Sequence, residues 1–146
     1  MWYNTVMQAI LRSPLHGMLS GNTLLLSCQG RRSGRLYTLP VNYVRSDDRL
    51  WITSARDRTW WRNLRGGAAV TVRLKGRDCP AHAVAFEDEA GVVDGLTAYL
   101  TAAPRMARYF GVSLGGDGRP MPEDIRRIAP GRVVVRVDLL PEEQGG

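Results

Sequence analysis

Short runs in which apolar and polar residues alternate are the dominant pattern along this chain, and they indicate strands with one buried face. The clearest run extends from Val70 to Lys75, and after a tight turn at Gly76 another returns from Asp78 to Phe86. Further strands are expected over residues 23–28, 37–43, 50–54 and 133–137. Because short turns join the strands, the pattern favours a mainly β fold of about six antiparallel strands, a meander or barrel with flanking helices, over a parallel sheet.

Helical spacing appears in four places. Apolar residues three and four apart from Trp2 to Leu11 predict an amphipathic helix within residues 1–20, and Asp57 to Arg65 reads as a short helix that Gly66-Gly67 ends. Asp88 can cap a helix that reaches about Ala103. The last helix begins at Pro122 and ends near Ala129. The buried stripe expected for the third helix consists of Val92, Val93, Leu96, Tyr99 and Leu100.

A proline and the two chain ends constrain the pattern further. Pro40 has no backbone N–H to donate, so its strand should lie at a sheet edge or bulge. We expect the N-terminal helix to cap the core; contact with a membrane surface is the alternative, although no Lys/Arg-rich face precedes Arg12. Residues 141–146 read as a disordered tail.

Length and composition bound the class of protein. A chain of 146 residues with 44% hydrophobic and 23% charged residues fits one soluble domain, residues 1–146. No apolar run approaches the roughly 20 residues of a membrane span, and no basic residue precedes the first apolar run as in a secretory signal. We therefore expect a cytoplasmic protein with both cysteines, Cys28 and Cys79, as free thiols.

The sequence lacks the residue patterns of several common metal, catalytic and nucleotide-binding sites. The two histidines, His16 and His82, and the two cysteines show no metal-ligand spacing, so we expect no metal site. No serine sits in a Gly-x-Ser-x-Gly elbow, and no phosphate-binding or dinucleotide-binding glycine motif of the standard kinds occurs.

The net charge of +6 raises the question of an anionic partner, because all but one of the 20 basic residues are arginine. A solvated basic surface is one interpretation. The other is the loop Gly30-Arg31-Arg32-Ser33-Gly34-Arg35, in which glycines let the backbone approach a ligand and arginines can make charge-assisted hydrogen bonds to a phosphate. An ordinary polar hairpin is the alternative for this loop. A second cluster, residues 54–65, holds adjacent tryptophans, one expected in the core and the other free to cover a planar ring.

These two clusters resemble the deazaflavin (F-420)-dependent nitroreductase and quinone reductase family of the flavin-binding split β-barrel superfamily. That family shows an apolar strand, Gly-Arg-Lys-Ser-Gly, an Arg-containing strand that runs into Pro, and later a Trp with Asn-Leu three residues on. The matching positions are Gly30 to Gly34, Arg35, Leu39-Pro40-Val41, and Trp60 with Asn63-Leu64. Arg32 replaces the usual Lys, and a shorter Ala55-Arg56-Asp57 stands before the Trp.

The resemblance implies a split β-barrel of the FMN-binding, pyridoxamine phosphate oxidase-like kind. It further implies an oxidoreductase that transfers hydride from F-420 to a quinone, a nitroaromatic or another activated double bond. Tyr99 or Tyr109 would cap the substrate or supply a proton, and core packing is the alternative for Tyr99. The sequence does not decide whether the protein forms a homodimer. The residues implied to bind the coenzyme are Arg31, Arg32, Ser33, Gly34, Arg35, Thr38, Leu39, Pro40, Val41, Ser54, Ala55, Arg56, Arg58, Trp60, Trp61 and Asn63.

Three alternatives remain. FMN could take the place of F-420 in the same barrel. A basic barrel with exposed aromatics could bind single-stranded nucleic acid, which we do not expect if the arginines form a pocket rather than a stripe. A barrel that binds a cofactor or lipid without catalysis would fail to oxidise a bound reduced cofactor.

Overall fold

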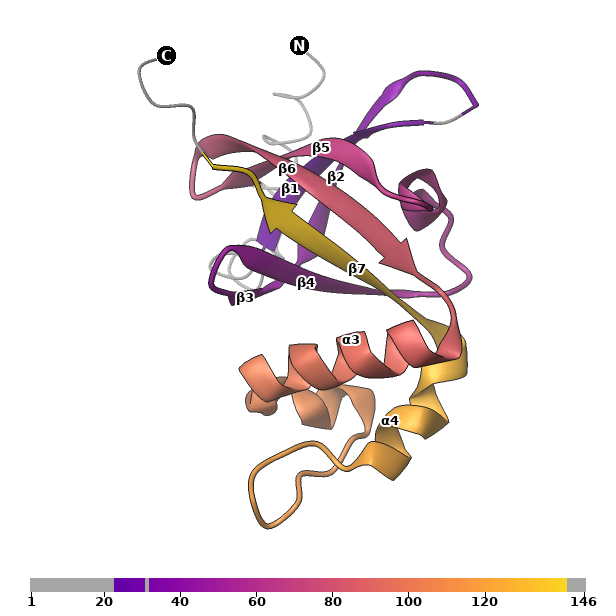
Figure 1. The fold of residues 1–146 in the computed structure, drawn as a ribbon, viewed down its shortest axis with the longest axis vertical. Helices are drawn as coiled ribbons and strands as arrows, with labels where there is room; N and C mark the ends of the chain where they lie inside the picture. Colours follow the sequence, from indigo (N-terminus) through magenta and orange to yellow (C-terminus); the bar gives the residue numbers. More distant parts are fainter. Residues whose placement is uncertain (1–22, 31, 142–146) are drawn as a thin grey trace, which may run out of the picture.

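Seven strands build the barrel. The computed structural model describes residues 23–30 and 32–141 (Figure 1). The predicted N-terminal helix, Arg31, and all of the predicted tail except Pro141 lie outside the described residues. The seven strands are β1 (Thr23–Gln29), β2 (Leu36–Asn42), β3 (Val44–Ser46), β4 (Arg49–Ala55), β5 (Ala68–Leu74), β6 (Arg77–Phe86) and β7 (Arg132–Leu139).

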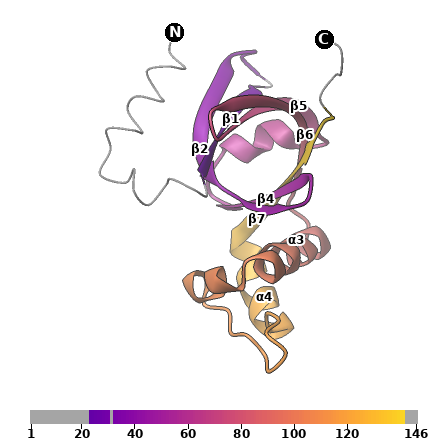
Figure 2. The same ribbon diagram turned by 90° about the vertical axis from the view of Figure 1, so that its left-hand side faces the viewer.

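These strands form one sheet that curls into a barrel. All neighbours are antiparallel, in the order β2-β1-β5-β6-β7-β4-β3. The two edge strands of this order, β2 and β3, follow each other in the chain with Tyr43 alone between them, so the curled sheet and this link form the ring seen end-on in Figure 2. The mainly β, split-barrel fold class is confirmed.

One strand more than expected appears because the turn at Asp47-Asp48 is tight. Asp47 adopts a left-handed φ of 56°, which lets β3 pair with the start of β4. The hairpin between β5 and β6 also turns as predicted, with Lys75 and Gly76 both at positive φ. β2 lies at the sheet edge and pairs only with β1, which explains how it accommodates Pro40.

The barrel interior follows the period-two pattern of the sequence. Leu24, Leu26, Val72 and Val135 are each at most 1% exposed, whereas Val41 is only half-buried on the edge strand. Trp61 and Leu64 come from η1 (Trp60–Leu64), a single 3₁₀ turn that plugs one end of the ring (Figure 2). This turn is shorter than the helix expected over Asp57 to Arg65.

The helices form a layer against the outside of β4 and β7 (Figure 1). The first is α3 (Glu89–Ala102), whose N-terminus is capped by the Asp88 carboxylate, the acceptor of a hydrogen bond from Gly91 N at 3.0 Å. The others are η2 (Pro104–Phe110), α4 (Pro122–Ile128) and η3 (Ala129–Gly131). The predicted stripe of α3 is buried except for half-buried Val93, and it packs against Val134 of β7. In the described part of the chain, no helix has the length and apolar character needed to cross a bilayer.

Candidate functional site

The loop between β1 and β2 is a tight, hydrogen-bonded turn. Gly30 N donates to Arg35 O at 2.8 Å, and Gly34 N donates back to Gly30 O at 2.9 Å. Gly34 has a φ of +69°, a conformation that side chains disfavour. The Ser33 hydroxyl oxygen accepts a hydrogen bond from Arg35 N at 3.2 Å, so its position is fixed by the turn. The loop therefore holds Arg32 and Ser33 at its exposed tip.

A groove of 610 Å³ separates this loop from η1. Two segments 20 or more residues apart in sequence form its walls, because the barrel places the β1–β2 turn beside the η1 end of the ring (Figure 1). Its lining residues are Gly30, Arg32, Ser33, Tyr37, Thr38, Leu39, Thr59, Trp60, Arg62, Asn63 and Arg65.

The groove is cationic. Three of its lining residues, Arg32, Arg62 and Arg65, carry guanidinium groups, and none is acidic. Arg65 is held by a two-pronged ion pair with Glu87, at 2.7 and 3.1 Å. Arg32 and Arg62 form no ion pair with any described residue. No described carboxylate offsets their positive charge, and the set of guanidinium, hydroxyl and amide donors fits a phosphate or carboxylate group.

Aromatic side chains form the other part of the groove. Trp60 lines it and is half-buried against the barrel core, whereas Trp61 is 2% exposed and lies inside the core. Arg62 and Arg65 stack over the Trp61 ring at 5.8 and 5.1 Å from its centroid. Trp60 is therefore the tryptophan that can face a ligand.

The structure brings six of the described predicted residues into this groove: Arg32, Ser33, Thr38, Leu39, Trp60 and Asn63. Gly34 and Arg35 shape the turn but do not line the groove, and Pro40 and Val41 lie further along β2.

The predicted residues after β4 have other surroundings. Ser54 is 7% exposed, and its hydroxyl donates to Ala55 O at 3.0 Å. The Arg56 side chain donates to Glu87 O and Arg132 O, which links the segment after β4 to the one before α3 and to the start of β7. Arg58 is exposed and lines neither this groove nor the pocket described next.

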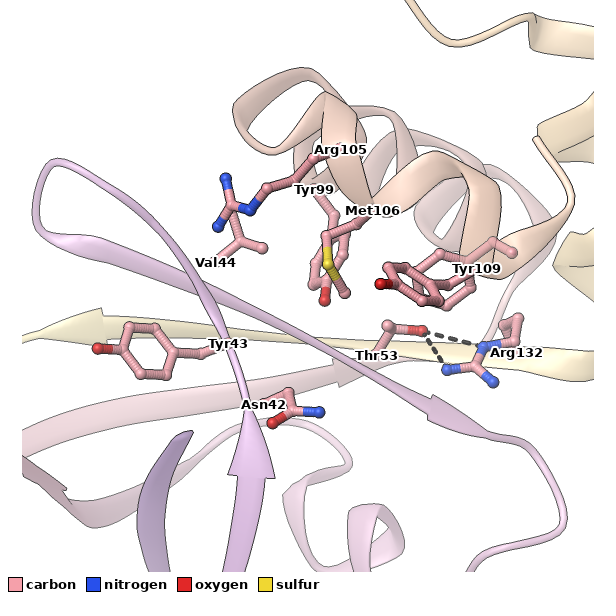
Figure 3. A pocket seen from close by; sticks show the side chains of 10 residues that line it. Asn42, Tyr43, Val44, Thr53, Tyr99, Arg105, Met106, Tyr109 and Arg132 are labelled. Carbon is pink, nitrogen blue, oxygen red and sulfur yellow. Dashed lines mark hydrogen bonds between the residues drawn. The ribbon is translucent and has the colours of Figure 1, made fainter. Parts of the chain in front are cut away.

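Tyr99 and Tyr109 lie in a different place, a pocket of 450 Å³ between the helix layer and the outer side of β4 (Figure 3). The side chains of Tyr99 and Tyr109 point into the space above Thr53. Tyr99 is 2% exposed and packs edge-on against Phe110 with ring centroids 5.8 Å apart, whereas Tyr109 is 67% exposed. The full lining consists of Asn42, Tyr43, Val44, Thr53, Tyr99, Arg105, Met106, Tyr109, Phe110 and Arg132.

Arg132 gives this pocket its polarity. Its Nε and one terminal nitrogen donate to the Thr53 hydroxyl at 3.1 and 3.0 Å, and its guanidinium stacks 5.2 Å from the Phe110 ring centroid. Burial lowers the pKa of Arg132, and the nearby Tyr99 opposes that shift. Burial raises the pKa of Tyr99, although the charges of Arg132 and Arg105 act in the opposite direction. The pocket thus places the buried Tyr99 near two guanidinium groups, those of Arg105 and Arg132.

Sequence reasoning missed functional residues in both places. Arg62 and Arg65 lie in the cluster of residues 54–65, but the sequence does not place them in the groove with the turn. Arg132 carried no signal, because a single arginine at the start of a strand looks like any solvated charge. The signal for the second pocket was the pair Pro104 and Gly111, which start and end η2 as proline and glycine do at helix termini.

Comparison with known proteins agrees with this barrel. A solved FAD-binding protein of Mesorhizobium loti matches with a TM-score of 0.52 and 16% identity, over 88% of this chain and 91% of that one. A general stress FMN/FAD-binding protein of Xanthomonas citri matches with a TM-score of 0.50 and 15% identity, over 98% and 95%. A structure described as a domain-swapped dimer matches with a TM-score of 0.52 and 18% identity, over 94% and 97%. These identities establish the fold alone.

Comparison of the sequence with protein families assigns the chain to a family. No curated protein matches this chain. The model of the F-420H(2)-dependent quinone reductases matches residues 3–111, well over half of the 146 residues and including both the turn and η1. The coenzyme predicted from the sequence is the one on which that family depends. The chain belongs to the F-420H(2)-dependent quinone reductase family, and is thus an oxidoreductase.

Proposed function

We propose that this protein binds F-420 with the phosphate of the coenzyme at the β1–β2 turn and uses it to reduce a quinone. The observation that carries the proposal is the groove beside η1, where Arg32 and Arg62 lack a carboxylate partner among the described residues. Two such guanidiniums near a fixed hydroxyl and an indole ring suit an elongated ligand with an anionic tail and a planar ring.

Each groove residue has a separate task in this proposal. Arg32 and the Ser33 hydroxyl hold the phosphate, while Arg31 belongs to the same assignment but lies outside the described residues. Arg62 and Asn63 face the anionic tail from the opposite wall, and the half-buried Trp60 excludes water from one side of the ligand. When bound, F-420H2 supplies a hydride and a proton, so that a quinone leaves as the hydroquinone and the coenzyme leaves oxidised.

The Tyr99–Tyr109 pocket is the proposed quinone site. Thr38 of the groove and Asn42 of the pocket are four residues apart on β2, which corresponds to about 13 Å along an extended strand. The raised pKa of Tyr99 keeps its hydroxyl protonated at neutral pH, so it can donate a hydrogen bond that orients a quinone oxygen. Exposed Tyr109 accepts a hydrogen bond from Arg108 at 3.0 Å and lies at the mouth of the pocket.

Parallel titrations with F-420 and FMN test the coenzyme. We expect saturable F-420 binding, followed by coenzyme fluorescence, and FMN binding at least about tenfold weaker. Because a ligand at 100 times its dissociation constant stabilises a protein by about 2.7 kcal/mol, F-420 should also raise the melting temperature. FMN binding as tightly as F-420, or no binding of either, would overturn the assignment.

The reaction is then tested under anaerobic conditions with F-420H2 and 2-methyl-1,4-naphthoquinone. We expect the absorbance of oxidised F-420 to return in proportion to the quinone consumed. A protein that binds F-420H2 tightly but never oxidises it in the presence of quinones or nitroaromatics would be a coenzyme-binding barrel without this catalysis.

A further inference from the structure

The quinone pocket is more positive than a neutral quinone requires. Two arginines, Arg105 and Arg132, are among its lining residues, and none of the lining residues is acidic. The rest of the lining is mostly aromatic or apolar, with Tyr43, Tyr99 and Tyr109 among them (Figure 3). A largely apolar space with two cations at its border has the chemistry to hold an aromatic ring that carries a negative charge.

The charge of Arg132 is held in place but not neutralised. Its hydrogen bonds go to the neutral hydroxyl of Thr53, and its flat face packs on Phe110. Neither Arg132 nor Arg105 forms an ion pair with any of the residues that the structure describes. Placing a half-buried guanidinium without a carboxylate costs free energy, which an anionic ligand would offset.

We propose that Arg105 and Arg132 select quinones that carry an acidic group, such as an ionised hydroxyl or a carboxylate, over neutral quinones of the same size. This inference rests on the proposed function and names the substrate class of its quinone pocket. The ring lies among the tyrosines, and the anionic oxygen faces the guanidinium of Arg132 with Arg105 at the rim. No covalent step differs from the reduction described above, because the arginines act on binding alone.

A matched pair of probes separates charge from shape. 2-Hydroxy-1,4-naphthoquinone is anionic at neutral pH, whereas 2-methyl-1,4-naphthoquinone is neutral and nearly the same size. Calorimetric titration of each into the coenzyme-free protein measures the preference without any catalysis. We expect the anionic quinone to bind about ten- to hundredfold more tightly, the range that one charge-assisted hydrogen bond supplies.

Variants assign the preference to the two arginines. Arg132→Gln should reduce the ratio of the two affinities at least about fivefold, and Arg105→Gln, which alters an exposed side chain, should reduce it in the same direction. Arg119→Gln is the control, because this exposed arginine lies on the loop after η2 and is absent from the pocket lining. Thermal melting checks that Arg132→Gln is folded. If that variant does not fold, Arg105→Gln still measures the effect of removing one of the two charges.

The outcomes separate this inference from the proposed function. Equal affinity of the wild-type protein for the two quinones, or a preference that survives in both arginine variants, would overturn the inference. A repeat titration with saturating oxidised F-420 should leave the affinity for the anionic quinone within about threefold. If saturating F-420 abolished the binding of the anionic quinone, the coenzyme ring and not the substrate would fill the pocket, and the inference would fall. If F-420 fails to bind while the charge preference holds, the coenzyme assignment falls and the pocket's selectivity stands.

Discussion

The guanidinium of Arg32 tests the coenzyme assignment at the scale of one residue. Arg32→Ala should weaken F-420 binding about ten- to hundredfold, because it removes at least one charge-assisted hydrogen bond to a phosphate. The melting temperature should change little, since this arginine is exposed and surface substitutions usually cost under about 0.5 kcal/mol. Fluorescence titration and thermal melting of the same samples measure both quantities.

Two further variants sharpen this measurement. Arg32→Lys should restore only part of the lost affinity if the contact is two-pronged, and nearly all of it if charge alone matters. Arg45→Ala is the control, because the Arg45 side chain donates to Asp47 O and does not line the groove. Equal losses from the Arg32 and Arg45 alanine variants would point to a diffuse positive field instead of a pocket.

A buried thiol makes stability sensitive to alkaline pH. Cys28 is 2% exposed in the barrel core, and burial raises the pKa of its thiol above the ordinary value of 9.0. Below about pH 9 the thiol is protonated in both the folded and the unfolded protein, so this group costs no stability. Above about pH 9 the thiol of the unfolded chain loses its proton first, which favours the unfolded state. The free energy of unfolding should therefore fall as the pH rises beyond 9.

Urea unfolding at pH 8, 9 and 10 measures this slope, and Tyr99, whose pKa burial also raises, adds to it only near and above pH 10. Cys28→Ala should flatten the profile between pH 9 and 10, whereas Cys79→Ala, which alters a half-buried thiol, should keep the slope of the wild type. A profile for Cys28→Ala parallel to the wild type would contradict the attribution to this thiol.

Single residues also show where sequence reasoning stops. Adjacent tryptophans predict one core and one outward ring, but only the barrel decides that Trp61 is inside and Trp60 lines the groove. The resemblance implies Ser54 and Arg56 as coenzyme-binding residues, yet their side chains bond to the carbonyl oxygens of Ala55, Glu87 and Arg132. Such hydrogen bonds join residues up to 76 positions apart, a pairing that no local pattern encodes.

At the scale of elements, α3 lies unusually close to β7 where Gly95 faces Val134. A Cβ added at Gly95 would stand 2.5 Å from Val134 Cγ1 and 2.9 Å from Val134 Cβ. Because a β-branched side chain on a strand cannot rotate its Cβ away, Gly95→Ala should push the helix outward. The overlap outweighs the gain of about 1 kcal/mol in helix propensity, and we expect a net loss of about 1–2 kcal/mol in stability.

Chemical denaturation checks this value, with a lower midpoint and an unchanged slope. Thr101→Ala, on an exposed position of the same helix, should raise stability by under about 0.7 kcal/mol. Val134→Ala combined with Gly95→Ala should cost less than the sum of the two single changes, because the second truncation relieves the overlap. Strict additivity would show that the two side chains do not compete for the same space.

Elements with a strong period were predictable, and short ones were not. The strands, α3 with its Asp88 cap and α4 lie close to the positions that alternation and helical spacing indicate. β3 and η2 were missed because three strand residues and two helical turns offer too few positions for a period. η2 nonetheless supplies four of the lining residues of the pocket proposed for the quinone, Arg105, Met106, Tyr109 and Phe110. The groove was predictable from its motifs, and the second pocket was not.

At the scale of the whole molecule, the described arginines behind the net charge of +6 fall into several groups. Five arginines, on β4, β5, β7, α4 and the segment after η1, are in ion pairs with carboxylates: Arg49, Arg65, Arg73, Arg127 and Arg136. Both sites also contain arginines that have no carboxylate partner among the described residues. Some line the groove beside η1, and the others line the pocket under η2. The groove and the pocket therefore hold two separate groups of cations, because they share no lining residue.

This distribution predicts weak binding of single-stranded nucleic acid. Affinity for a strand comes from a continuous row of cations that releases many counterions at once, together with stacked bases. Two separate sites release few counterions, so the dissociation constant for a fluorescent oligothymidine at physiological salt should exceed about 1 μM. F-420 should displace any oligothymidine that binds in the groove. Anisotropy titrations at two salt concentrations measure the affinity and its salt dependence. A sub-micromolar constant at physiological salt, with a steep salt slope and no displacement by F-420, would instead favour a nucleic-acid-binding barrel.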